Sequence, residues 1–112
     1  MEGVYVFDGD AGECEVIADC DPAVGFTKTT YEPTSGIYAG RQARAMLVQV
    51  LTNSVNVTKN GTTPTATAGT NKGLTYAAGT SFWVIGINNI RNFKAIDAVS
   101  GSAGVVKGEP YF

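Results

Sequence analysis

The sequence predicts an all-β protein: a single antiparallel β-sandwich or jelly roll with an extended, acidic N-terminal segment. Short β-prone runs follow one another at close spacing with no long helical pattern between them, which favours a sandwich over a parallel α/β sheet. The 112 residues are 44% hydrophobic and only 16% charged. This composition fits one hydrophobic core and excludes a highly charged, disordered chain.

The N-terminal third begins with two predicted strands, residues 4–7 and 14–18. Between them, the Gly and Asp residues of 8–12 favour a turn, so we expect a hairpin. Proline and glycine recur through residues 21–40. That stretch therefore holds at most one strand, around residues 26–31, and is otherwise an extended connection.

The next two strands are predicted at residues 42–51 and 55–58. Good helix formers occupy 41–47, but the alternation of side chains through this region has the period of a strand. Asn60-Gly61 follows, and this pair tolerates the two positive φ angles of a type I′ turn. We therefore expect a tight hairpin there.

A second hairpin is predicted from residues 74–76 and 81–85. Two more short strands fit residues 90–96 and 104–107, which gives about seven to nine strands in total. Trp83 alternates with Phe82 and Val84, so we expect it to face outward. The expected core consists of Met46, Val48, Val50, Val55, Val57, Leu74, Phe82, Val84, Ile90, Phe93 and Ile96.

Charge divides the chain into two parts. Seven acidic residues precede Lys28, which is the first basic residue. We therefore separate an acidic N-terminal hairpin or arm, residues 1–41, from a β-sandwich body, residues 42–112, within one structural domain. The acidic part is either a solvated edge or a surface that docks on a basic neighbour, with salt-dependent association. The candidate assembly interface consists of Asp8, Asp10, Glu13, Glu15, Asp19, Asp21 and Trp83.

The sequence offers no catalytic machinery, so we expect no enzymatic activity. It contains no His, which removes the commonest general base and metal ligand. Residues 8–13 open like a calcium loop but depart from the EF-hand spacing, and two cysteines are too few for structural zinc. Cys14 and Cys20 are expected to be reduced thiols. We predict no cofactor, metal, small-molecule substrate, nucleic acid or membrane contact.

About half of the chain resembles a known group of proteins. The stretch Val-Asn-Val-Thr-Lys-Asn-Gly-Thr-Thr-Pro-Thr-Ala-Thr at 55–67, then Leu74, Ala78-Gly79, and Ile-Arg-Asn-Phe-Lys-Ala-Ile at 90–96, resembles small β-sandwich virion proteins of tailed bacteriophages. Some small phage β-sandwiches are capsid decoration, or cement, proteins. The Asn-Gly-Thr-Thr-Pro-Thr piece is also similar to a β-sandwich appendage of bacterial carbohydrate-active enzymes, but Asn60 replaces the usual Asp, and sugar recognition is not carried over.

The resemblance implies a structural protein of the virion, made in the host cytoplasm. We expect a capsid decoration protein that binds and stabilises the head lattice. Its expected partners are the major capsid protein or neighbouring virion subunits, and it is expected to form a homo-oligomer. The alternatives are a carbohydrate- or receptor-binding module of a tail fibre or tip, with Trp83, Tyr76 or Tyr38 stacked on sugars, and a head-tail connector component.

Overall fold

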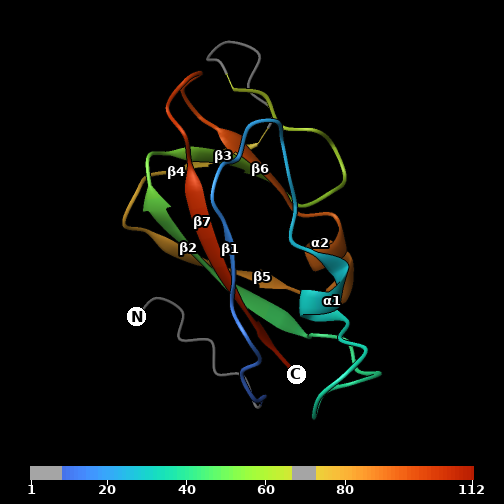
Figure 1. Cartoon of the computed structure of the whole chain (residues 1–112). Helices are drawn as coiled ribbons and strands as arrows, with labels where there is room; N and C mark the ends of the chain where they lie inside the picture. The colour runs from blue at the N-terminus through green and yellow to red at the C-terminus, as the bar shows by residue number, and fades with distance from the viewer. Residues whose placement is uncertain (1–8, 67–72) are drawn as a thin grey trace, which may run out of the picture.

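The computed structural model describes residues 9–66 and 73–112, which form strands in two antiparallel sheets with two short helices (Figure 1). This confirms the all-β prediction. The four-stranded sheet has the order β1-β7-β2-β5, and the three-stranded sheet has the order β4-β3-β6. The elements are β1 (Glu15–Ile17), α1 (Lys28–Tyr31), β2 (Ala45–Thr52), β3 (Val55–Thr58), β4 (Leu74–Tyr76), β5 (Ser81–Ile85), α2 (Ile87–Arg91), β6 (Lys94–Asp97) and β7 (Val105–Tyr111).

The long strands β7 and β2 form the middle of the four-stranded sheet. Side chains of β7 alternate strictly between buried and half-buried, as expected for a strand with one face on a core. Gly108 lies on the buried face, where a Cβ atom would come within 2.6 Å of Phe26 Cζ and 2.8 Å of Met46 Sδ. A glycine at this position therefore lets two large side chains pack directly on the backbone of β7.

β3 is the central strand of the three-stranded sheet, and all four of its residues are buried. Its one amide side chain, Asn56, has a hydrogen-bond partner in strand β4 and another in the loop that follows β3. Asn56 Nδ2 donates to the carbonyl oxygen of Thr65 at 2.7 Å, and Asn56 Oδ1 accepts a hydrogen bond from the Thr75 hydroxyl at 2.5 Å. A buried polar residue is tolerated here because both ends of its amide have partners.

A single hydrophobic cluster joins the two sheets and the segment that precedes β2. It includes Val48 and Val106 from the four-stranded sheet and Val55 from the three-stranded sheet. Residues 9–41 contribute β1, α1 and four side chains of this cluster: Ile17, Cys20, Phe26 and Tyr31. One core therefore extends across the division drawn between residues 41 and 42.

Two of the predicted hairpins, at Asn60-Gly61 and between β4 and β5, lie within the described residues. In both, the predicted strand pairing is wrong. At Asn60-Gly61, only Gly61 has positive φ (85°), whereas a type I′ turn needs it at both residues. β3 pairs instead with β4 and β6. Strands β4 and β5 have the predicted bounds, but they lie in different sheets, so residues 77–80 carry the chain from one sheet to the other.

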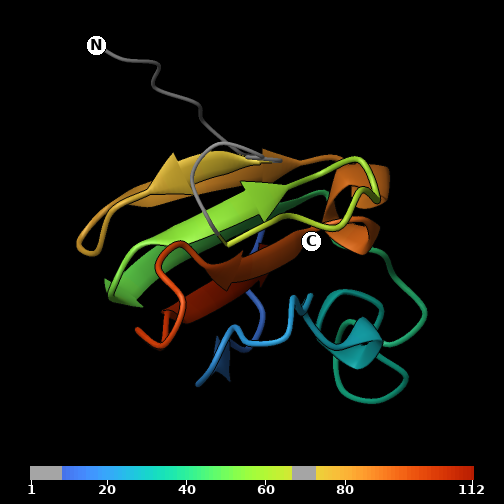
Figure 2. The ribbon, with the colours of Figure 1, turned by 90° about the horizontal axis from the view of Figure 1, so that it is seen from above.

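Two short helices replace predicted extended segments. α2 occupies the start of the strand expected at 90–96, and the observed strand β6 begins only at Lys94. The sequence predicts at most one strand in residues 21–40, around 26–31, and this prediction is wrong because α1 occupies residues 28–31. Both helices lie on the same side of the molecule in two views (Figures 1 and 2). Arg91, in α2, forms an ion pair with Glu32, the residue after α1, at 3.1 Å.

Most of the expected core is buried, with one clear exception. Leu74 is 65% exposed because it belongs to β4, a strand at the edge of the three-stranded sheet. Phe82 and Ile96 are half-buried, and the other expected core residues are buried. The strand predicted at residues 4–7, and with it the first hairpin, lies outside the described residues.

We predict that Gly108→Val lowers the free energy of unfolding by about 1–3 kcal/mol, because the new side chain must displace Phe26 or Met46. Urea denaturation measures the change. Gln49→Ala is the matched control, since Gln49 is exposed on the neighbouring strand, and it should change stability by less than about 0.5 kcal/mol. Equal stability of the two variants would contradict the packing around Gly108.

Candidate functional site

The four-stranded sheet has an outer face, which points away from the hydrophobic cluster and carries several apolar side chains. Among them, Val16 is 52% exposed, Leu51 47% and Ile85 42%. Antiparallel sheets with one solvated face normally alternate apolar and polar residues, and here many outward positions are apolar. The outer face consists of Cys14, Val16, Leu47, Gln49, Leu51, Ser81, Trp83, Ile85, Lys107, Glu109 and Tyr111.

Trp83 is an aromatic residue of this outer face, as its alternation with Val84 predicts. It pairs across the sheet with Leu47, which in turn pairs with Glu109. The Trp83 and Tyr111 rings meet edge to face, with centroids 5.3 Å apart and an interplanar angle of 61°. Trp and Tyr are the residues most enriched at the energetic centres of protein interfaces.

Next to Trp83, the outer face has a small hollow of about 170 Å³, lined by Cys14, Leu47, Gln49, Lys107 and Glu109. Glu109 Oε1 accepts a hydrogen bond from the Tyr111 hydroxyl at 2.5 Å, and Oε2 accepts one from Cys14 Sγ at 3.7 Å. The bond to Glu109, together with burial, raises the pKa of Tyr111. The one carboxylate of the outer face is thus held by neighbouring side chains.

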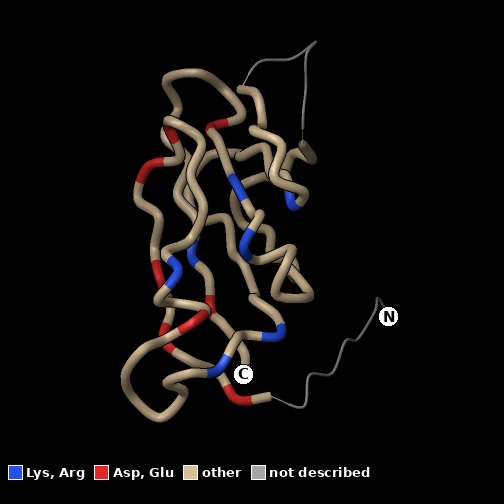
Figure 3. Tube along the Cα trace, turned by 90° about the vertical axis from the view of Figure 1, so that its right-hand side faces the viewer, with Lys and Arg blue, Asp and Glu red and all other residues tan. Residues whose placement is uncertain are grey.

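The acidic edge consists of four exposed carboxylates on either side of β1: Asp10, Glu13, Asp19 and Asp21. β1 is itself an edge strand, and most acidic residues lie along one side of the molecule (Figure 3). Residues 9–27 include no Lys or Arg. The structure therefore leaves these four predicted interface residues available to solvent, whereas Asp8 lies outside the described residues.

Glu15 differs from the other predicted interface acids because its own chain uses its carboxylate. The Thr27 backbone N–H donates to Oε1 at 2.8 Å, and the Thr27 hydroxyl donates to Oε2 at 2.8 Å. The Thr30 hydroxyl donates to Oε1 at 2.6 Å. Glu15 therefore fastens the first turn of α1 to β1, which is a structural role that its charge alone does not reveal.

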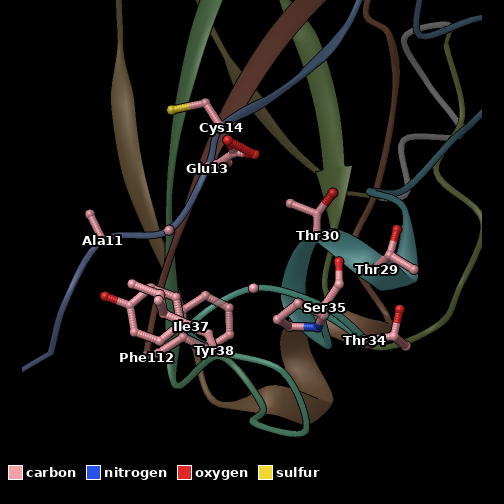
Figure 4. A pocket seen from close by; sticks show the side chains of 13 residues that line it. Ala11, Glu13, Cys14, Thr29, Thr30, Thr34, Ser35, Ile37, Tyr38 and Phe112 are labelled. Carbon is pink, nitrogen blue, oxygen red and sulfur yellow. The ribbon is translucent and has the colours of Figure 1, made fainter.

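A larger opening, which we call the hydroxyl cleft, lies beside β1 and has a volume of about 720 Å³. Residues 11–14 line one side, and α1 with residues 33–38 lines the other (Figure 4). At its base the rings of Tyr38 and Phe112 stack with centroids 4.7 Å apart. The guanidinium of Arg41 lies 5.7 Å from the centroid of the Tyr38 ring and donates to the Phe112 carbonyl oxygen at 3.2 Å.

Sequence reasoning did not identify the hydroxyl cleft, because its walls come from segments far apart in the chain. Tyr38 was named only as a ring for sugar stacking. The one local signal is the group of small hydroxyl residues Thr29, Thr30, Thr34 and Ser35, of which the first two lie in the strand predicted around residues 26–31 and the other two in the predicted connection.

The two cysteine thiols lie in different environments. Cys14 is exposed, and Cys20 is completely buried. Burial, followed by the charge of Asp97, raises the pKa of Cys20 to about 12. The pKa of Cys14 is also raised, chiefly by partial burial and secondarily by Glu109.

The described residues offer no group of three His, Cys, Asp or Glu side chains that could hold a metal ion. In the same part of the chain, no helix is long and apolar enough to cross a membrane. The sequence matches no protein-family model, and neither the curated proteins nor the solved structures contain a significant match.

We predict that Glu15→Ala lowers the free energy of unfolding by about 1–3 kcal/mol, since the Thr27 and Thr30 donors lose their acceptor. Hydrogen exchange should also show faster exchange of the α1 amides. Glu13→Ala removes the same charge from an exposed site and should change stability by less than about 0.5 kcal/mol. If both variants had the same stability, the role of Glu15 in holding α1 would be wrong.

We predict that iodoacetamide alkylates Cys14 but not Cys20 in the folded protein at about pH 8. With a pKa of about 12, Cys20 is a thiolate in only roughly one molecule in ten thousand at that pH, and it is also inaccessible. Mass spectrometry of the digested protein locates the adduct, and unfolding in urea should make both thiols reactive. Equal labelling of the two in the folded state would contradict the burial of Cys20.

Proposed function

We propose that this chain is a bacteriophage virion structural protein, a capsid decoration protein that docks on the head lattice through its outer face. The observation that carries the proposal is the group of adjoining apolar side chains on the outer face, in which Trp83 lies beside Leu47, Ile85 and Tyr111 and Ile85 is 42% exposed. Contiguous exposed apolar side chains with aromatic residues among them are characteristic of protein-binding surfaces. The resemblance of about half of the chain to small phage virion proteins supports the same function.

The proposed partners are the major capsid protein or neighbouring virion subunits, including further copies of this chain. A decoration protein makes the same contact many times over a symmetric lattice, so a modest interface suffices for stable attachment. The acidic edge would add attraction to basic surfaces, and that contribution weakens as salt screens it. The proposal includes the finer fold, a β-sandwich or jelly roll, which the hydrophobic cluster shared by the two sheets supports.

The alternative of a glycan-binding module has less support from the arrangement of the aromatic rings. Sugar recognition by stacking needs an open ring face. Tyr38 and Tyr76 each have one face stacked on a neighbouring ring, Phe112 and Phe82, and Trp83 meets Tyr111 edge to face, so part of the aromatic surface is already used within the chain. A head-tail connector would use the same outer face and would differ from a decoration protein in copy number and symmetry.

We predict that Ile85→Lys weakens binding to phage capsids at least about tenfold, because it places a charge on an apolar interface. The measurement is co-sedimentation with capsids of the phage that encodes the chain, prepared without this protein. Val99→Lys is the matched control, since Val99 is exposed but lies outside the outer face, and it should bind within about twofold of the unsubstituted protein.

Cryo-electron microscopy of the decorated capsid would then show which face contacts the lattice. Failure of the unsubstituted protein to bind capsids would overturn the decoration proposal. Equal binding by the Ile85 and Val99 variants would overturn the assignment of the outer face.

A further inference from the structure

The backbone of residues 11–13 presents an unpaired edge to the hydroxyl cleft. On the side of β7, the Gly12 N–H donates to the Pro110 carbonyl at 2.8 Å, and the Phe112 N–H donates to the Asp10 carbonyl at 2.9 Å. The polar backbone groups of an extended chain alternate between its two sides. Those of Ala11 therefore point away from β7, and the backbone groups of Ala11 and Glu13 make no hydrogen bond to any other described residue.

The side chains around this edge favour a cationic ligand. Glu13 lines the cleft with an exposed carboxylate, and no described residue donates a hydrogen bond to it. Across the cleft lie the hydroxyls of Thr29, Thr34 and Ser35, as Figure 4 shows. No Lys or Arg is among the described residues that line the cleft, although Arg41 lies close to its base. The charge nearest to a ligand is thus negative.

The form of the cleft favours an extended peptide over a sugar. Its volume of about 720 Å³ is in the range of ligand-binding clefts. Phe112 is buried, and the Tyr38 ring lies against Phe112 with Arg41 nearby, so the base offers little open aromatic surface to a sugar. An open strand edge beside the cleft is the geometry in which a peptide adds a strand to a sheet.

We propose that the hydroxyl cleft binds an extended, basic polypeptide segment of a partner protein. The segment pairs through its backbone with the free groups of Ala11 and Glu13 and places a Lys or Arg side chain against the Glu13 carboxylate. The Thr29, Thr34 and Ser35 hydroxyls supply further hydrogen bonds. This contact adjoins the outer face at Cys14 but uses other groups, and it extends the proposed function by naming the chemistry of a second partner segment.

The test uses the full chain and three synthetic seven-residue peptides with blocked ends. The first alternates Thr and Lys, the second has Glu in place of Lys, and the third repeats the first with every backbone nitrogen methylated. Two-dimensional ¹H–¹⁵N NMR titrations should show the first peptide shifting the amides of Ala11, Glu13, Thr34 and Ser35. The Glu peptide should not bind because of charge repulsion, and the methylated peptide should not bind because it cannot donate the strand hydrogen bonds.

Glu13→Gln removes the carboxylate from the cleft, and we expect it to raise the Kd of the Thr-Lys peptide about two- to fivefold. Asp19→Asn is the matched control: it removes the same charge from the acidic edge at a residue that does not line the cleft, and it should leave the Kd unchanged. An equal loss in both variants would show non-specific attraction to the acidic edge and would overturn the proposal.

Two further outcomes would also overturn the proposal. One is the absence of shifts around the cleft at millimolar peptide, and the other is binding of a neutral disaccharide, such as maltose, at the same amides in place of the peptide. These outcomes are independent of the capsid experiment, which uses Ile85 on the outer face. Capsid binding with no peptide binding would refute only the cleft, and peptide binding with no capsid binding would refute only the decoration function.

Discussion

The pairing of β7 with β1 on one side and β2 on the other is the constraint on which the rest of this structure depends. It joins parts that are distant in the chain, as Glu15 lies opposite Gly108 and Ala45 lies opposite Tyr111. Its alternation places Val106 in the core and Glu109 on the outer face. A register shift of one residue would exchange these faces, so the core and the apolar outer face are specified together.

The same pairing explains why residues 9–41 belong to the core cluster. β1 has only three residues, and a strand that short is weak by itself. Ile17 on β1 and Phe26 beyond it add apolar burial, and Glu15 ties α1 to the strand by three hydrogen bonds. The acidic residues that remain exposed around β1 are those that neither the core nor α1 uses, so the carboxylates of the acidic edge stay in contact with solvent.

Local sequence patterns predicted most of the strands but not how they pair. β2, β3, β4 and β5 lie where alternation and β propensity place them, and Trp83 faces outward as expected. The turn signal at Asn60-Gly61 could not show that β3 is a central strand with two other partners. Helices of four and five residues have no detectable period. Likewise, the sequence could not show that the Glu15 carboxylate is hydrogen-bonded within the chain while that of Glu13 is exposed. The donors to Glu15 come from Thr27 and Thr30, which only the fold brings near.

The hydrogen bonds around Glu109 affect how the outer face can be covered. A carboxylate that loses water without replacement partners opposes association strongly. Glu109 keeps the Tyr111 hydroxyl and the Cys14 thiol as partners when water leaves, so part of its solvation is supplied by the protein itself. In the proposed docking on the outer face, a negative charge at this position favours partner surfaces that bring a compatible polar group opposite it and disfavours uniformly apolar ones.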